Sequence, residues 1–375
     1  MKPLTIYHVF LVLAAISLLA ALVLFVNNNA AVGGILLIVV FISLAFGFRG
    51  YEILKGFSYS MMIFAAVTIA LIYPQYFQEV NGFRFASLIT PLIQLIMFGM
   101  GTKMGIRDFA GVVKMPKAVI IGLAGHYTVM PLMGFFLAWI FNFPAEIAAG
   151  VILIGSMPCG LASNVMSYLA NANLALAITL TAVSTLISPF LSPLWMKVLG
   201  GQYIEVDAFA MMWDIIKMVI LPIGAGLLFN YIFKGKVKWL HKAMPYVSMF
   251  GIAFIIVIIT ASGRDNLMTI GPALILCAFI HNTTGYLFGY WIGRLCHLNE
   301  RDSRTIAIEV GMQNGGLASG LAKEMGKAAT LGLAPAVFGP LMNITGSILA
   351  SYWHRKPPEP EVSGQRSAVS GQQPV

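Results

Sequence analysis

The sequence predicts an all-α membrane protein with about twelve transmembrane helices. Three observations predict it: 59% of the 375 residues are hydrophobic, only 10% are charged, and apolar runs recur along most of the chain. Soluble domains carry roughly 25% charged residues. A helix needs about 20 mostly apolar residues to cross the hydrocarbon core of a bilayer. The composition therefore excludes a soluble fold.

The apolar runs follow one another from the first residues almost to the end of the chain. We expect a transmembrane helix in each of them: 5–26, 33–48, 58–75, 88–104, 117–141, 146–169, 174–197, 208–233, 244–262, 268–293, 304–322 and 328–353. The first run is long for the apolar part of a signal peptide and no small-residue cleavage pattern follows it, so we expect a retained helix. Residues 356–375 are rich in Pro, Ser, Gly and Gln, which predicts a disordered tail.

Basic residues are divided unequally between the two sets of loops that these helices create. An even number of crossings puts both termini on one side, and most Lys and Arg residues fall in the loops of that side. The opposite loops hold only Arg84, Lys197, Arg264, Lys323 and Lys327. Because positive loops stay in the cytoplasm, both termini are expected there. This asymmetry also explains the net charge of +9 without a nucleic-acid partner.

The first polar interruption lies in the run that contains Pro158 and Gly160. Proline removes a backbone hydrogen bond and glycine allows non-helical geometry, so backbone carbonyls and amides become free to bind ions. A short Asn-rich turn at Ala172 then folds two helices into a hairpin. Ser163 and Thr181 are equally far from Ala172 along the chain, so we expect their oxygens at the same depth near mid-membrane.

The second interruption lies in the run 304–322, where Glu309, Gln313 and Asn314 stand among glycines. Gln313 would share a helical face with Glu309 if the helix continued. A charge at the centre of a membrane helix costs roughly 2.5–3.5 kcal/mol even on lenient scales, so a carboxylate there needs a partner. A bound cation is the natural one, and oxygen ligands suit sodium better than zinc or copper.

At these residues the sequence resembles the bile acid:sodium symporter family, whose hallmarks are an ASN-containing broken helix and an EVGMQN-type broken helix. The resemblance covers roughly residues 55–353 and is that of a bacterial inner-membrane member. It implies ten helices in two inverted five-helix repeats, about 58–200 and 208–353, with crossed discontinuous helices and core and panel domains. Residues 1–50 would add two transmembrane helices before a transporter domain at 55–355.

The resemblance also implies two sodium sites. The first corresponds to Ser163, Asn164, Thr181 and Glu309, with Ala177 where the family has a further serine. The second corresponds to the following set: His126, Glu309, Gln313 and the backbone carbonyls of Val310 and Met312. His126 stands where the family has a glutamine. It could ligate sodium weakly, titrate and make the site proton-linked, or only pack as a hydrogen-bonded histidine.

A substrate crevice beside the helix crossing is implied at Gly160, Leu161, Asn314 and Asn343. Leu161 and Met342 replace polar residues of relatives, so we expect a more apolar pocket. His281 and Asn282 form another polar pair inside a helix, and we expect them to support the broken helices by hydrogen bonding.

These features together predict a sodium-coupled symporter of a small organic anion, bile acid-like, pantoate-like or another carboxylate, working by alternating access. Sodium would be the coupling ion, and no other cofactor is expected. No metalloprotease motif or paired catalytic aspartates occur, so enzyme activity is not expected. Two alternatives stay open. One is a proton-coupled organic anion transporter, and the other is a metalloid-anion exporter that would use Cys159.

Overall fold

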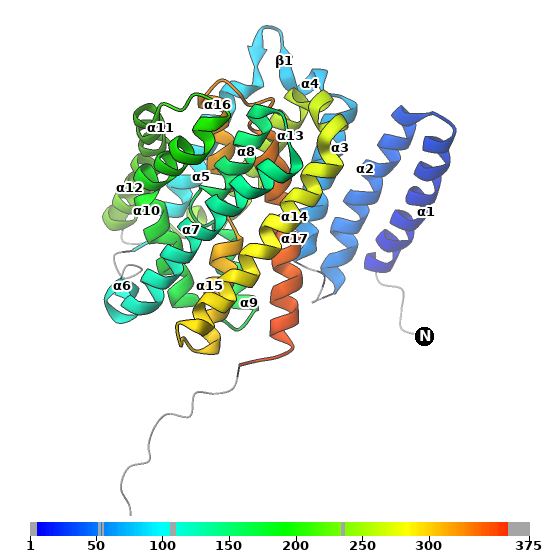
Figure 1. Cartoon of the computed structure of the whole chain (residues 1–375). Helices are drawn as coiled ribbons and strands as arrows, with labels where there is room; N and C mark the ends of the chain where they lie inside the picture. Colours follow the sequence, from blue (N-terminus) through cyan, green and yellow to red (C-terminus); the bar gives the residue numbers. More distant parts are fainter. Residues whose placement is uncertain (1–5, 52–53, 55, 106–109, 234–236, 359–375) are drawn as a thin grey trace, which may run out of the picture.

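The computed structural model describes residues 6–358, apart from 52–53, 55, 106–109 and 234–236 (Figure 1). The expected tail therefore lies outside the described residues from position 359 onward. The described chain is helical almost throughout, and each predicted run contains a helix or a broken pair of helices. Eight of the described helices are long and apolar enough to span a membrane, and shorter apolar helices accompany them. The predicted all-α membrane protein is confirmed.

The helices vary in length from single turns to 32 residues. In chain order they are α1 (Ile6–Val26), α2 (Ala30–Gly47), α3 (Phe57–Ile72), α4 (Gln75–Gln78), α5 (Ile89–Gly101), α6 (Ala110–Lys114), α7 (Pro116–Phe141), α8 (Ala145–Gly155), α9 (Ala162–Leu169), α10 (Leu174–Leu199), α11 (Ala208–Ile215), α12 (Leu221–Phe233), α13 (Lys238–Ser262), α14 (Arg264–Leu295), α15 (Glu300–Gly311), α16 (Gly315–Glu324) and α17 (Leu333–His354).

The two N-terminal helices form a hairpin at one edge of the molecule, and α2 lies beside α3 (Figure 1). α2 and α3 can approach closely because Gly34 has no side chain. A Cβ atom at this position would collide with Ile72 of α3. Near the other end of α2, the Ser58 hydroxyl donates to the Ala45 carbonyl at 2.5 Å. Most large apolar side chains of α1 are exposed, as expected for a helix that faces lipid.

The remaining helices repeat one order of elements. Three helices (α3, α5, α7) precede the broken pair α8–α9 and then α10, and α11–α12, α13 and α14 precede the broken pair α15–α16 and then α17. This is the order expected of the two predicted repeats. We use core helices for α7–α10 and α14–α17, and panel helices for α3, α5, α11–α12 and α13. A π-helical segment, Ile216–Ile220, joins α11 to α12 and was not predicted.

A small antiparallel hairpin interrupts the all-helical pattern between α4 and α5. Strands β1 (Glu79–Val80) and β2 (Phe83–Arg84) pair at the end of the molecule opposite the start of α1 and the end of α17 (Figure 1). Asn81 and Gly82 both have positive φ, at 51° and 82°. An Asn-Gly turn of this kind is the commonest two-residue hairpin connection.

Candidate ion and substrate site

The two broken helices meet where their helical geometry is lost. The Gly160 amide donates to the Met312 carbonyl at 2.8 Å, and the Asn314 amide donates to the Pro158 carbonyl at 2.8 Å. These bonds form a single antiparallel bridge between Cys159 and Gln313. A Cβ atom at position 160 would lie 2.7 Å from the Gln313 carbonyl oxygen, so only glycine allows this approach. The predicted crossing of broken helices is present.

Three of the four residues predicted for the first sodium site lie together beside this crossing: Ser163, Thr181 and Glu309. Thr181 of α10 donates to Oε2 of Glu309 on α15 at 2.9 Å. The Ser163 and Thr181 hydroxyl oxygens are 3.4 Å apart. They therefore lie at similar depths, as predicted from the hairpin geometry. Ser163 also donates to the Gly160 carbonyl at 2.7 Å. Ser163, Thr181 and Glu309 are all buried.

Several acceptor oxygens at the crossing have no hydrogen-bond partner among the described residues. They are Glu309 Oε1, Asn164 Oδ1 and Gln313 Oε1, and each atom is buried. A buried acceptor without a partner costs roughly 1–3 kcal/mol, and more when it is charged. Carboxylate and amide oxygens bind hard cations well. The unpartnered Glu309 oxygen, next to the hydroxyls of Thr181 and Ser163, is therefore of the type that suits a hard cation such as sodium.

The second predicted set is arranged differently. Both ring nitrogens of His126 are within hydrogen-bonding distance of backbone carbonyl oxygens. Nε2 is 2.8 Å from the Met157 oxygen, and Nδ1 is 3.1 Å from the Glu309 oxygen. α15 ends at Gly311, so the helix does not continue to Gln313 and the condition under which Gln313 would share a helical face with Glu309 is not met. Its Nε2 atom instead donates back to the Val310 carbonyl at 2.5 Å.

Side chains of α14 hold the second break in place. The Asn282 amide donates to the Gly311 carbonyl at 2.5 Å, and its Oδ1 atom accepts from the Thr345 hydroxyl of α17. His281 Nε2 lies 3.0 Å from the Met130 carbonyl of α7. Asn282 thus supports the second broken helix as expected, whereas the His281 hydrogen bond goes to α7, which is not broken.

A second cluster, which the sequence reasoning missed, ties the α9–α10 turn to the start of α15. Asn173 Nδ2 donates to Asp302 at 2.7 Å, and the Asn173 amide donates to the Thr305 hydroxyl at 2.9 Å. The buried Arg304 guanidinium donates to the Ala170 carbonyl at 3.4 Å and also contacts the ring of Trp353. The sequence feature that could have indicated this cluster is Arg304, a charged residue at the edge of an apolar run.

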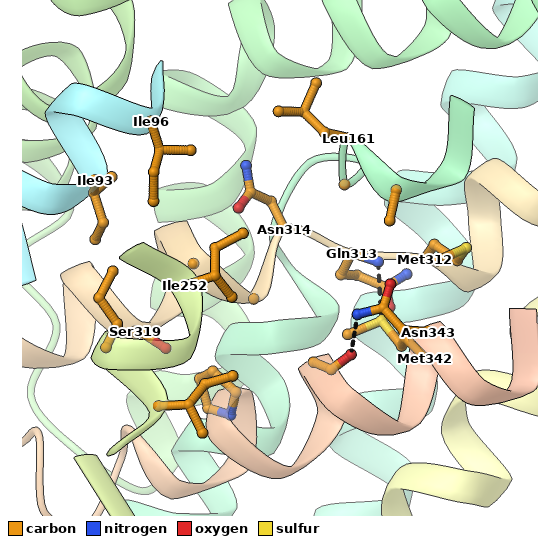
Figure 2. Close-up of a pocket in the computed structure, with 18 of the residues that line it drawn as sticks. Ile93, Ile96, Leu161, Ile252, Met312, Gln313, Asn314, Ser319, Met342 and Asn343 are labelled. Carbon is orange, nitrogen blue, oxygen red and sulfur yellow. Dashed lines mark hydrogen bonds between the residues drawn. The ribbon is translucent and has the colours of Figure 1, made fainter. Parts of the chain in front are cut away.

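A cavity of about 100 Å³ lies between the crossing and the panel helices (Figure 2). All four predicted substrate residues line it: Gly160, Leu161, Asn314 and Asn343. Figure 2 shows Ile93, Ile96 and Ile252 opposite the extended segment that carries Asn314. Sequence reasoning missed this apolar wall, which consists of Ile63, Ile93, Ile96, Met97, Ile252, Ile255 and Ile256.

The polar atoms of this cavity are amides and one hydroxyl. Asn314 Oδ1 caps α16 by accepting from the Leu317 amide at 3.0 Å, which leaves its NH2 group for a ligand. Asn343 Nδ2 donates to the Gly339 carbonyl at 2.9 Å, which leaves its oxygen (Figure 2). No charged side chain occurs among the described residues that line the cavity.

Comparison with known proteins agrees with this arrangement. The sodium bile acid symporter family matches residues 90–270. A protein of Bacillus subtilis (strain 168), described as an uncharacterized sodium-dependent transporter (YocS), is 38% identical over 299 residues, which cover 78% of this chain and 92% of that protein. The chain belongs to the sodium bile acid symporter family.

Plant members of the sodium bile acid symporter family are similar as well. The probable chloroplastic sodium/metabolite cotransporter BASS1 of Arabidopsis thaliana is 35% identical, with 71% of this chain and 67% of that protein covered. BASS3 of Oryza sativa subsp. japonica, also described as a probable chloroplastic sodium/metabolite cotransporter, is 32% identical, with 78% and 69% covered. These relatives are transporters, in agreement with the prediction that the chain is not an enzyme.

Proposed function

We propose that this protein is a sodium-coupled symporter that moves a small organic anion across the membrane by alternating access. Sodium would bind at the first site, formed by Ser163, Asn164, Thr181 and Glu309. The observation that carries the proposal is the buried, unpartnered Oε1 atom of Glu309, whose carboxylate lies beside the Thr181 and Ser163 hydroxyls. The names of the relatives, a sodium-dependent transporter and sodium/metabolite cotransporters, support the choice of ion.

The substrate would bind in the cavity on the other face of the crossing. Met312, Gln313 and Asn314 line that cavity and lie three to five residues after Glu309 in the chain. An ion that fixes the Glu309 carboxylate also fixes the start of this extended segment. Sodium binding therefore stabilises the backbone that forms the substrate cavity. The affinity for the substrate is then higher when sodium is bound, as coupling requires.

A carboxylate is the anion class that we assign to the cavity. The N-terminal turn of α16 faces it at Gly315 and Gly316, and a helix N-terminus attracts negative charge through its backbone amides. The NH2 group of Asn314 adds a donor. The apolar wall suits the apolar part of such a substrate, so bile acid-like, pantoate-like and other apolar carboxylates are the candidates.

The two alternative functions rest on single residues. A metalloid-anion exporter would use Cys159, but this side chain is buried and is not among the described residues that line the cavity. The described residues also contain no cluster of three or more His, Cys, Asp or Glu side chains able to hold a metal ion. Proton coupling would use His126, whose ring nitrogens contact backbone carbonyls. The burial of Cys159 away from the cavity favours an organic anion over a metalloid anion as substrate, and the names of the relatives favour sodium over protons as the coupling ion.

The orientation is part of the same proposal. The start of α1 and the end of α17 lie at the same end of the molecule (Figure 1). Positive residues are concentrated in loops at that end, so both termini would be in the cytoplasm and the protein in the inner membrane.

The test compares purified wild-type protein with Glu309→Gln, which keeps the size of the side chain and removes its charge. We expect sodium, but not potassium or choline, to raise the thermal unfolding midpoint of the wild type. Sodium should leave Glu309→Gln unchanged, because the carboxylate that holds the ion is gone. In proteoliposomes, a panel of small carboxylates should include one whose uptake requires a sodium gradient. A wild type that responds equally to all three cations contradicts the proposal.

A further inference from the structure

Hydrogen bonds fasten the turn between α9 and α10 to the first two turns of α15. The Asn173 amide donates to the Thr305 hydroxyl at 2.9 Å, and this hydroxyl lies 3.1 Å from the Asn173 carbonyl oxygen. The Asn173 side chain donates to Asp302 at 2.7 Å. On the other arm of the turn, Arg304 donates to the Ala170 carbonyl at 3.4 Å. We use hairpin clasp for the contacts of Asn173 with Asp302 and Thr305.

The hairpin clasp joins the same helices that carry the first sodium site. Ser163 lies in α9, Thr181 in α10 and Glu309 in α15. Glu309 follows Thr305 by four residues, so both lie on one face of α15, about 6 Å apart along the helix axis. Asn173 is the residue directly before α10. The clasp therefore sets where the two hydroxyls of the site lie relative to the carboxylate.

Hydrogen bonds connect α10 with α15 at two levels. One level is the hairpin clasp, and the other is the bond from Thr181 to Glu309 at 2.9 Å, inside the sodium site. A cation held by the carboxylate and the hydroxyls must bring these helices together. Where the clasp has already done so, less ordering is required when the ion binds, and the affinity is higher.

A related contact lies at the opposite end of the molecule, between the α16–α17 loop and the start of α8. The Thr330 hydroxyl donates to Glu146 at 2.5 Å, and Lys327 pairs with the same carboxylate. In both contacts a threonine hydroxyl joins the turn after one broken pair to the start of the other. α8, α16 and their loop contain no residue of the first sodium site. This second contact is therefore a matched reference for the hairpin clasp.

We propose that the hairpin clasp positions the first sodium site, and that Thr305 and Asp302 are positioning residues for sodium binding. Each acts through the placement of α10 against α15. The proposal rests on the proposed function, because it concerns the same sodium site. It goes beyond that function by adding residues of the α15 start, which belong to neither predicted sodium set.

The experiment measures the Kd for sodium by titrating the thermal shift of purified full-length protein. Thr305→Val keeps the shape of this buried side chain and removes its hydroxyl. We expect the Kd to rise about two- to tenfold, as for the loss of an uncharged hydrogen bond. Thr305→Ser keeps the hydroxyl and should restore the wild-type Kd. Thr330→Val should leave the Kd within about twofold, because it breaks the contact at the opposite end.

A second pair of variants tests the clasp at Asp302, which is only half-buried. Asp302→Ala removes the acceptor of the Asn173 side chain and should raise the Kd for sodium. Asp302→Asn removes the charge and keeps an acceptor oxygen, so it should raise the Kd less. Equal rises would assign the effect to the lost charge and overturn the proposal. This pair decides the question even if Thr305→Val does not fold.

The outcomes separate the hairpin clasp from the proposed function. A wild type that does not bind sodium overturns both. A wild type that binds sodium, with an unchanged Kd in Thr305→Val or, if that variant does not fold, in Asp302→Ala, overturns the clasp alone. An equal rise in Thr305→Val and Thr330→Val also overturns it, because a general loss of stability would then explain the weaker binding.

Discussion

The amide of Gly160 and the carbonyl of Met312 join two helices that are far apart in the sequence, through a hydrogen bond of 2.8 Å. Each residue lies where its own helix is interrupted, so neither group is used in a helix. The bond satisfies two backbone groups that would otherwise be unpaired in the membrane. The breaks that free the site oxygens thus stabilise each other.

Gly160→Ala should disrupt this crossing. The new methyl group would lie 2.7 Å from the Gln313 carbonyl oxygen, so the two segments must separate. Overpacking of this kind costs about 1–3 kcal/mol. We expect a lower thermal unfolding midpoint and a strongly reduced stabilisation by sodium, both measured on purified protein.

Gly224→Ala is the control for this change. Gly224 lies in α12, and a Cβ atom there meets nothing within 4 Å. Alanine also favours a helix over glycine by about 1 kcal/mol. The control should keep the wild-type response to sodium. An unchanged response in Gly160→Ala as well would mean that the crossing tolerates a side chain at position 160.

Thr181→Val should weaken sodium binding without removing a charge. The variant deletes the hydroxyl that donates to Glu309 Oε2 and that lies 3.4 Å from the Ser163 hydroxyl. Hydrogen bonds to charged groups contribute about 1.5–3 kcal/mol, which corresponds to a rise of roughly 10- to 150-fold in the Kd for sodium. Titration of the thermal shift with sodium measures this change.

Thr185→Val is matched to it, one turn further along α10. The Thr185 hydroxyl is also buried, but it donates only to the Thr181 carbonyl of its own helix, at 2.7 Å. Its removal should leave the Kd for sodium within about twofold, since a hydroxyl bonded within its helix contributes little to a site elsewhere. Equal effects of the two variants would remove Thr181 from the sodium site.

Asn343→Ala should weaken binding of the substrate and leave binding of sodium unchanged. Asn343 lines the cavity, and it belongs to neither sodium set. Losing one uncharged hydrogen bond costs about 0.5–1.5 kcal/mol, so the KM for the transported carboxylate should rise about two- to tenfold. The thermal shift caused by sodium alone should be unchanged. A loss of sodium stabilisation in this variant would show that the two sites are not distinct.

The breaks and the contact between Ser163 and Thr181 could be predicted from the sequence because their chemistry is local. Pro158 and Gly160, close together in one run, favour a break in the helix, and the turn at Ala172 fixes which residues of the hairpin face each other. The contact between Ser163 and Thr181 follows from that geometry.

Other features depend on contacts between distant segments. The orientation of the His126 ring is set by Met157 and Glu309, which lie far apart in the chain. The apolar wall was not predictable because an apolar residue in a membrane helix can face either lipid or a cavity, and the sequence does not distinguish the two. The hairpin at Asn81–Gly82 had a recognisable turn signal, and the dominant helical pattern obscured it.

The panel and core helices are in contact at the end of the molecule opposite the start of α1 and the end of α17 (Figure 1). The Thr90 hydroxyl of α5 donates to Glu324, the last residue of α16, and Glu324 also pairs with Lys323. Alternating access requires the panel and core helices to separate at one mouth of the cavity and then at the other. Thr90→Val should weaken the closed state of this mouth, because the core loses its hydrogen bond to α5.

Accessibility of a cysteine placed at Ser319, which lines the cavity, measures the opening. A membrane-impermeant thiol reagent added on the side of Glu324 should react about two- to tenfold faster when Thr90→Val is present, as expected for the loss of about 0.5–1.5 kcal/mol from the closed state. Thr269→Val is the control, since the exposed Thr269 donates only to Asp265 of its own helix. A rate that is the same in both backgrounds would show that the contact between Thr90 and Glu324 does not hold this mouth closed.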